Sequence, residues 1–104
     1  MVRDQGRADA LAKDLEVPRA YSSVDDLLAD DKLDAIYVSS PVNLHPEHAI
    51  AVAESGKHVL CEKPMALTSD GCRRIIAACE AADVHLQVCF VLRGWPIYQR
   101  LRTM

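Results

Sequence analysis

Short apolar runs alternate with segments of helical periodicity along most of this 104-residue chain. The runs span residues 33–39, 58–61 and 86–90, and the first is apolar on both faces, as is typical of a buried strand in a parallel sheet. Strands that alternate with helices indicate right-handed β-α-β crossovers. The sequence therefore predicts an α/β fold, with a parallel sheet and flanking helices.

Capping residues and apolar spacing predict the helices that join these runs. Ser23 is placed to cap a short helix, with Asp25 and Asp26 in its positive first turn. Thr68 or Ser69 is placed to cap a longer helix whose apolar stripe has 3.6-residue spacing. The other expected helices span residues 7–15, run from Pro46 to a close at Gly56, and begin at Trp95-Pro96.

Composition excludes several classes of partner. The formal net charge is −3 and no basic block is present, so neither nucleic acid nor an anionic membrane is an expected partner. No apolar run approaches the ~20 residues that a membrane span needs. The cysteines form no C-x-x-C motif, which favours small buried thiols in a reducing cytoplasm at Cys61, Cys72, Cys79 and Cys89.

Polar residues follow each of the three apolar runs. Ligands of open parallel sheets bind beyond the carboxyl ends of the strands, so these residues are expected to converge on one edge. They are Ser39, Ser40, Pro41, Asn43 and His45 after the first run, Glu62, Lys63 and Pro64 after the second, and Arg93 and Trp95 after the third.

The second run ends abruptly on Glu62, Lys63 and Pro64. Neighbours in an extended chain point apart, so the carboxylate and the ammonium are not expected to neutralise each other. A carboxylate accepts hydrogen bonds from paired hydroxyls, and a lysine can hold or protonate a substrate oxygen. The Lys63-Pro64 bond is a candidate cis peptide. Spacing alone leaves open a plain alternative, in which Lys-Pro ends a strand and Glu62 is a solvated surface charge.

The order of motifs in this region resembles one family. Ser40-Pro41 is followed by Asn43 and His45, then by G-K-H-V at residues 56–59 and E-K-P at residues 62–64. This order is similar to that of the Gfo/Idh/MocA family, the glucose–fructose oxidoreductase and inositol dehydrogenase-like enzymes that use NAD(P). The resemblance extends over essentially the whole chain and is weakest before Ser23.

The resemblance implies a Rossmann-like domain and a role for each motif residue. Lys63 is implied to be the catalytic lysine at the hydride-transfer site, and Glu62 to contact the cofactor near the nicotinamide ribose. Pro64 is implied to be the cis proline. The residues implied to line the nicotinamide and its ribose are Ser40, Pro41, Asn43 and His45, and Arg93 is implied to contact cofactor or substrate.

Arg3 bears on the choice between NAD and NADP. By the resemblance, it follows the strand whose end meets the adenine ribose, where an arginine suits the 2′-phosphate of NADP. Asp4 next to it has the opposite preference. An exposed charge leading into a helix is the alternative interpretation of Arg3, and the sequence favours NADP only slightly.

Several other residues have interpretations that need no ligand. His45 and His48 are three residues apart and could both face a metal, but no third ligand with suitable spacing is evident, which favours partial helix capping. Trp95 is predicted to lie in a core rather than to serve as a stacking platform.

Expected parts of a dinucleotide-binding domain are missing from the sequence. The glycines are Gly6, Gly56, Gly71 and Gly94, so no G-x-G turn exists to meet a pyrophosphate. Residues 1–104 are therefore expected to form a partial NAD(P)-binding Rossmann domain without its first strand, from a truncated gene or a misplaced start, with no substrate domain. The edge of residues 33–39 is expected to stay unpaired and to favour a homo-oligomer.

Two functional hypotheses from different classes follow. The first is an NAD(P)-dependent oxidoreductase acting by hydride transfer on a sugar, cyclitol or related polyol, or on the corresponding ketone. The second is a non-catalytic Rossmann fragment or interaction module. Without the glycine turn, the chain alone is expected to bind NADP or NAD weakly.

Overall fold

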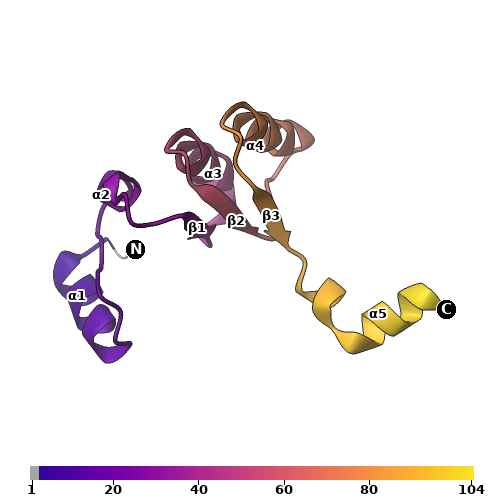
Figure 1. Cartoon of the computed structure of the whole chain (residues 1–104), viewed down its shortest axis with the longest axis horizontal. Coiled ribbons are helices and arrows are strands. Elements are labelled where there is room, and N and C mark those ends of the chain that lie inside the picture. The colour runs from indigo at the N-terminus through magenta and orange to yellow at the C-terminus, as the bar shows by residue number, and fades with distance from the viewer. Residues whose placement is uncertain (1–2) are drawn as a thin grey trace. The chain divides into compact units, whose positions relative to one another are not determined.

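A computed structural model describes residues 3–104 (Figure 1). The chain divides into two compact units, residues 1–33 and residues 34–104, which we call the N-terminal and C-terminal units. The boundary falls one residue into the first predicted strand, residues 33–39, and just before the strand that the structure forms at Ala35. Each unit is described by itself below.

The N-terminal unit contains two capped helices, α1 (Gln5–Asp14) and α2 (Val24–Ala29). The side chain of Asp4 accepts a hydrogen bond from the Arg7 N–H at 2.7 Å, so α1 begins two residues before the predicted start. Ser23 caps α2 as predicted, by accepting from the Asp26 N–H. Both helix starts therefore follow local capping chemistry.

A buried carboxylate organises the end of the N-terminal unit. Asp30 is 9% exposed, and its Oδ2 accepts from Arg19 Nη1 at 2.6 Å and from the hydroxyl of Tyr21. Its Oδ1 accepts from the Lys32 N–H at 2.9 Å. The hydrogen bonds from Tyr21 and Lys32 lower the pKa of Asp30 to about 2.

The C-terminal unit contains a parallel sheet of β1 (Ala35–Val38), β2 (His58–Glu62) and β3 (Leu86–Cys89). The strands lie in the order β1-β2-β3, with Val38 opposite Cys61 and Cys61 opposite Val88. All three predicted strands and their parallel pairing are confirmed. Within residues 3–104, β1 pairs only with β2, so its other edge has no strand partner there.

Two crossover helices, α3 (His45–Glu54) and α4 (Ser69–Ala81), lie on the same face of the sheet (Figure 1). Thr68 caps α4 as predicted, and Gly56 follows α3 with a φ of 77° that suits glycine. The core lies between this sheet face and the two helices. Its fully or almost fully buried residues are Val38, Ala49, Val52, Ala53, Val59, Cys61, Ile75 and Cys79.

The cysteines are free thiols. Cys61 and Cys79 are buried as predicted, and burial raises the pKa of Cys61 to about 11. Cys72 and Cys89 are only half-buried, so the prediction of buried thiols is wrong for these two.

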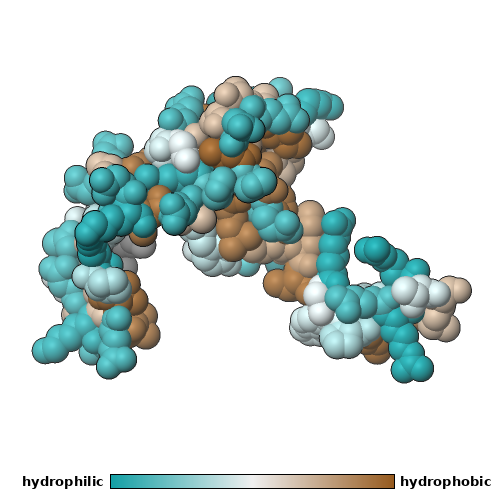
Figure 2. Space-filling model, in the orientation of Figure 1, coloured by the Kyte–Doolittle hydropathy of each residue, from teal (hydrophilic) through white to brown (hydrophobic). Residues whose placement is uncertain are grey.

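The chain after β3 forms a short 3-10 turn, η2 (Val91–Gly94), and then α5 (Pro96–Thr103). The start of α5 at Pro96 is as predicted. Trp95 is 54% exposed, so the prediction that it lies in a core is wrong. Figure 2 shows hydrophobic residues at the surface of both units, and along α5 they include Ile97 and Leu101. Among the described residues, no helix has the length and apolar character to cross a membrane.

Candidate functional site

The predicted edge of polar residues exists in the C-terminal unit. Because the strands are parallel and in register, the chain leaves β1, β2 and β3 at the same edge of the sheet. Ser39 and Ser40 follow β1, and Lys63 and Pro64 follow β2. Arg93 follows β3 within η2. The geometry thus brings residues from three strands to one edge, as the sequence predicts.

Glu62 is the last residue of β2, and both oxygens of its carboxylate are engaged. The hydroxyl of Tyr37 on β1 donates to Oε1 at 2.7 Å, and the backbone N–H of Lys63 donates to Oε2 at 2.8 Å. These hydrogen bonds lower the pKa of Glu62, the bond from Tyr37 most strongly. Glu62 is therefore a fixed, ionised acceptor.

Lys63 is exposed, and a cis peptide bond joins it to Pro64 as predicted. The backbone N–H of Lys63 donates to the Glu62 carboxylate, but within residues 3–104 the Lys63 ammonium makes no ion pair. The prediction that Glu62 and Lys63 do not neutralise each other is confirmed. The ammonium is free to meet an oxygen supplied by a ligand.

His45 is buried beneath this edge, at 2% exposure. Its Nε2 lies 2.8 Å from the carbonyl oxygen of Ser40, and its Nδ1 lies 2.9 Å from the carbonyl oxygen of Pro64. The imidazole thus bridges the loop after β1 and the turn after β2. Its contact with a cofactor stays a prediction.

The two histidines do not cap α3. That helix has no side-chain cap, and His48 Nδ1 instead lies 2.8 Å from Ser40 Oγ, so the capping interpretation is wrong. Both rings therefore contact Ser40 in the loop after β1, His45 at the backbone carbonyl and His48 at the hydroxyl. Among residues 3–104, no group of three or more His, Cys, Asp or Glu side chains is arranged to hold a metal ion.

The other predicted cofactor contacts are accessible. Pro41 and Asn43 are exposed in the loop after β1. Arg93 is exposed, with its guanidinium carbon 4.8 Å from the centre of the Phe90 ring. Arg3 is exposed in the N-terminal unit, immediately before the Asp4 cap. Their roles toward a cofactor stay predictions.

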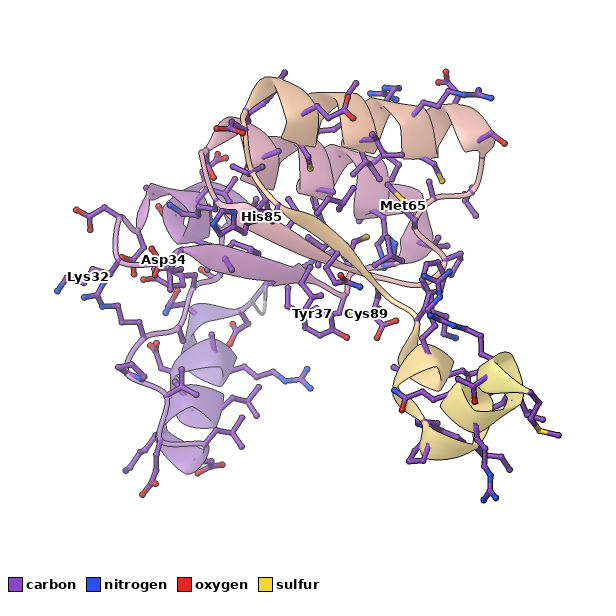
Figure 3. All side chains as sticks on the ribbon, turned by 45° about the vertical axis from the view of Figure 1, so that its right-hand side comes forward. Lys32, Asp34, Tyr37, Met65, His85 and Cys89 are labelled. Carbon is purple, nitrogen blue, oxygen red and sulfur yellow. The ribbon has the colours of Figure 1, made fainter. Side chains whose placement is uncertain are left out.

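Tyr37 is the residue that the sequence interpretation missed. Strand register gives the signal that would have found it: Tyr37 pairs with Leu60, so Glu62 lies two residues further along the same face. A long side chain reaches such a diagonal neighbour. Figure 3 shows Tyr37 and Cys89 on the sheet face away from α3 and α4.

A family profile identifies the family of this chain. The profile for “Oxidoreductase family, NAD-binding Rossmann fold” matches residues 1–90. The chain belongs to the Gfo/Idh/MocA family of oxidoreductases. The matched residues include all three strands and the Glu62-Lys63-Pro64 turn, so the resemblance carried by these motifs is confirmed.

Two proteins that are similar to this chain are named as dehydrogenases. The chain is 44% identical over 98 residues to D-xylose 1-dehydrogenase (NADP(+)) 2 of Haloferax volcanii. The aligned residues make up 94% of this chain and 30% of that protein. A probable dehydrogenase from Thermotoga maritima has a crystal structure that matches with a TM-score of 0.90 and 34% identity, over 97% of this chain and 31% of that one.

A further structure illustrates a bound relative. The WlbA dehydrogenase from Bordetella pertussis, in complex with NADH and UDP-GlcNAcA, matches with a TM-score of 0.80 and 36% identity, over 88% of this chain and 26% of that one. The chain therefore spans about a third or less of the length of these relatives.

Proposed function

We propose that this chain serves an NAD(P)-dependent oxidoreductase that moves a hydride between the nicotinamide and an alcohol carbon of a sugar, cyclitol or related polyol. The observation that carries this proposal is the Glu62-Lys63-Pro64 turn at the carboxyl edge of a parallel sheet. Relatives that match over 90% of the chain are named as dehydrogenases, so the non-catalytic alternative has less support.

The residues present fit the nicotinamide half of the cofactor. A carboxylate has about four acceptor positions, and Glu62 uses one on each oxygen, which leaves about one on each for a pair of ribose hydroxyls. The sequence offers no G-x-G turn for the pyrophosphate. With these two remaining acceptor positions, Glu62 would hold the nicotinamide ribose beside Lys63.

Lys63 would do the acid–base chemistry. When bound, the nicotinamide supplies or accepts the hydride. Lys63 would hold the substrate oxygen. Its ammonium would give that oxygen a proton when a ketone is reduced, and its neutral amine would take the hydroxyl proton when an alcohol is oxidised. The bridge from His45 to the Pro64 carbonyl would keep this turn in place.

Lys63→Ala tests this assignment in the natural protein. Turnover of D-xylose or an inositol with NADP or NAD should fall about 10²–10⁴-fold, the usual contribution of a general acid–base group. Cofactor affinity, measured by calorimetric titration, should change far less, because the lysine meets the substrate oxygen rather than the phosphates. Lys13→Ala, an exposed lysine on α1, is the matched control. Unchanged turnover in Lys63→Ala would remove Lys63 from this role.

We propose that the preferred cofactor is NADP. Asp4, the residue with the opposite preference, already accepts a hydrogen bond from the Arg7 N–H, whereas Arg3 is exposed. A free arginine suits the 2′-phosphate. Arg3→Ala should raise the KM for NADP about 10- to 100-fold and leave the KM for NAD nearly unchanged, because a charge-assisted hydrogen bond contributes about 1.5–3 kcal/mol. An equal effect on both cofactors would contradict this assignment.

A further inference from the structure

Tyr37 is a large aromatic residue whose position on β1 is not explained by burial in the core. It lies on β1 with 52% exposure, on the sheet face that α3 and α4 do not cover (Figure 3). An aromatic residue so placed adds little to the core. Its hydroxyl nevertheless donates to Glu62, 25 residues later in the chain. The contact joins the ends of two strands at the candidate site.

The contact determines which acceptor positions of Glu62 remain. The carboxylate torsion of a glutamate is broad, so a free carboxylate samples many directions. Tyr37 engages Oε1 while the Lys63 N–H engages Oε2, which selects one orientation. The remaining acceptor position on each oxygen then has a fixed direction. Two adjacent hydroxyls of a ligand could each find one.

The charge on Glu62 is coupled to the same hydroxyl. The hydrogen bond to Glu62 raises the pKa of Tyr37 to about 12, and this bond is also the largest cause of the lowered pKa of Glu62. Other groups face the pair from each neighbouring element. Lys63 in the turn and His45 on α3 lower the pKa of Glu62, and Cys89 on β3 raises that of Tyr37.

We propose that Tyr37 is a positioning residue, whose hydroxyl holds the Glu62 carboxylate in the direction that receives the paired hydroxyls of the cofactor ribose. The proposal rests on the proposed function for its ligand. In this role the hydroxyl of Tyr37 meets the Glu62 carboxylate rather than the ligand. Tyr37 acts through Glu62, whose Oε1 accepts from its hydroxyl.

A carboxyl titration by ¹³C NMR tests the contact in the 104-residue chain. Tyr37→Phe keeps the ring and removes the hydroxyl, so the pKa of Glu62 should rise toward its ordinary value. Tyr98→Phe is the matched control, because Tyr98 is similarly exposed, at 44%, and makes no hydrogen bond to Glu62. Amide spectra of both variants report whether the fold is retained. An unmoved Glu62 pKa in a folded Tyr37→Phe would overturn the proposal.

The reciprocal experiment follows tyrosinate absorbance. The step near pH 12 that belongs to Tyr37 should disappear in Tyr37→Phe and move to lower pH in Glu62→Gln, because a neutral amide no longer opposes the phenolate. The pKa of Tyr21 is also raised, by its hydrogen bond to Asp30, so only the step that Tyr37→Phe removes belongs to Tyr37. If that step persists unchanged in Glu62→Gln, the proposal is contradicted.

Kinetics of the natural protein test the ligand. Tyr37→Phe should raise the KM for the cofactor about 3- to 10-fold and change kcat little, the reverse of the pattern expected for Lys63→Ala. A moved Glu62 pKa with an unchanged cofactor KM would overturn the positioning role. If the natural protein used no dinucleotide at all, the proposed function would fail, and the titrations would still decide the Tyr37–Glu62 contact by themselves.

Discussion

The two units of this chain are stabilised in different ways. In the C-terminal unit, the crossover helices α3 and α4 cover one face of the sheet, and residues such as Val59, Cys61 and Ile75 are almost fully buried. In the N-terminal unit, Ala8 is the one buried apolar residue among those described, and Leu15 is 69% exposed. The strand–helix repeat forms its own apolar core. The stability of the two helices in the N-terminal unit depends instead on their caps and on the hydrogen bonds that Asp30 accepts from Arg19 and Tyr21.

The largest expected effect is in the core of the C-terminal unit. Ile75 on α4 is 0% exposed, so Ile75→Ala should lower the free energy of unfolding by about 2–5 kcal/mol. Hydrogen exchange of amides in β2 and α4 measures this loss. Amides of α1 should keep their protection, because the N-terminal unit has its own contacts.

Ile76→Ala is the matched control, since this neighbour on the same helix is 42% exposed. It should cost well under half as much as Ile75→Ala. Equal losses from the two substitutions, or a parallel loss of protection in α1, would contradict the contrast between the units.

A smaller effect is expected at the junction of the two crossover helices. A Cβ at Gly71 would lie 2.9 Å from the Cβ of Ala66 and 3.4 Å from Cγ of Pro46. Overpacking costs about 1–3 kcal/mol, while alanine gains at most about 1 kcal/mol of helix propensity over glycine. Gly71→Ala should therefore destabilise the C-terminal unit by about 1 kcal/mol, measured by hydrogen exchange in α3 and α4.

Gly94→Ala is the control for Gly71→Ala, because nothing lies within 4 Å of a Cβ built there. It should leave exchange in α3 and α4 unchanged. A Gly71→Ala variant as stable as the starting chain would contradict this prediction, and would mean that the loop containing Ala66 moves away from the new Cβ at little energetic cost.

The contrast also explains how much of the fold the sequence predicts. Periodicity and caps are local signals, so the three strands, the Ser23 and Thr68 caps and the start of α5 were predicted correctly. Trp95 was misplaced because its burial depends on what packs against η2 and α5, which no local pattern reports. The two 3-10 turns, η1 (Val42–Leu44) and η2, were missed for the same reason, since they follow from loop geometry.

The candidate site was predictable as far as strand ends determine it. Parallel topology places Glu62 and Lys63 at the edge once the strands are known. The partners of these residues depend on register and loop paths instead. The Tyr37 contact needs the register of β1 against β2, and the His45 bridge needs two loops to meet over α3. Neither follows from the spacing of residues along the chain.

The last prediction concerns acid and the N-terminal unit. The pKa of Asp30 is about 2 when folded and near the ordinary 3.8 when unfolded, so the unfolded chain binds this proton first. The stability that Asp30 contributes is therefore fully present above about pH 4, falls between that pH and about 2, and is lost below. Amide spectra of α1 and α2 should change in this window, before those of the sheet core, which holds no buried carboxylate among its described residues.

Asp30→Asn isolates the cause of that change. The amide removes the charge that Arg19 and Tyr21 share, so the variant should be less stable at neutral pH and should respond less between pH 4 and 2. Asp31→Asn, an exposed neighbour, should behave like the starting chain. If the two variants titrate alike, the acid response belongs to other carboxylates, and the N-terminal unit depends on its helix caps rather than on Asp30.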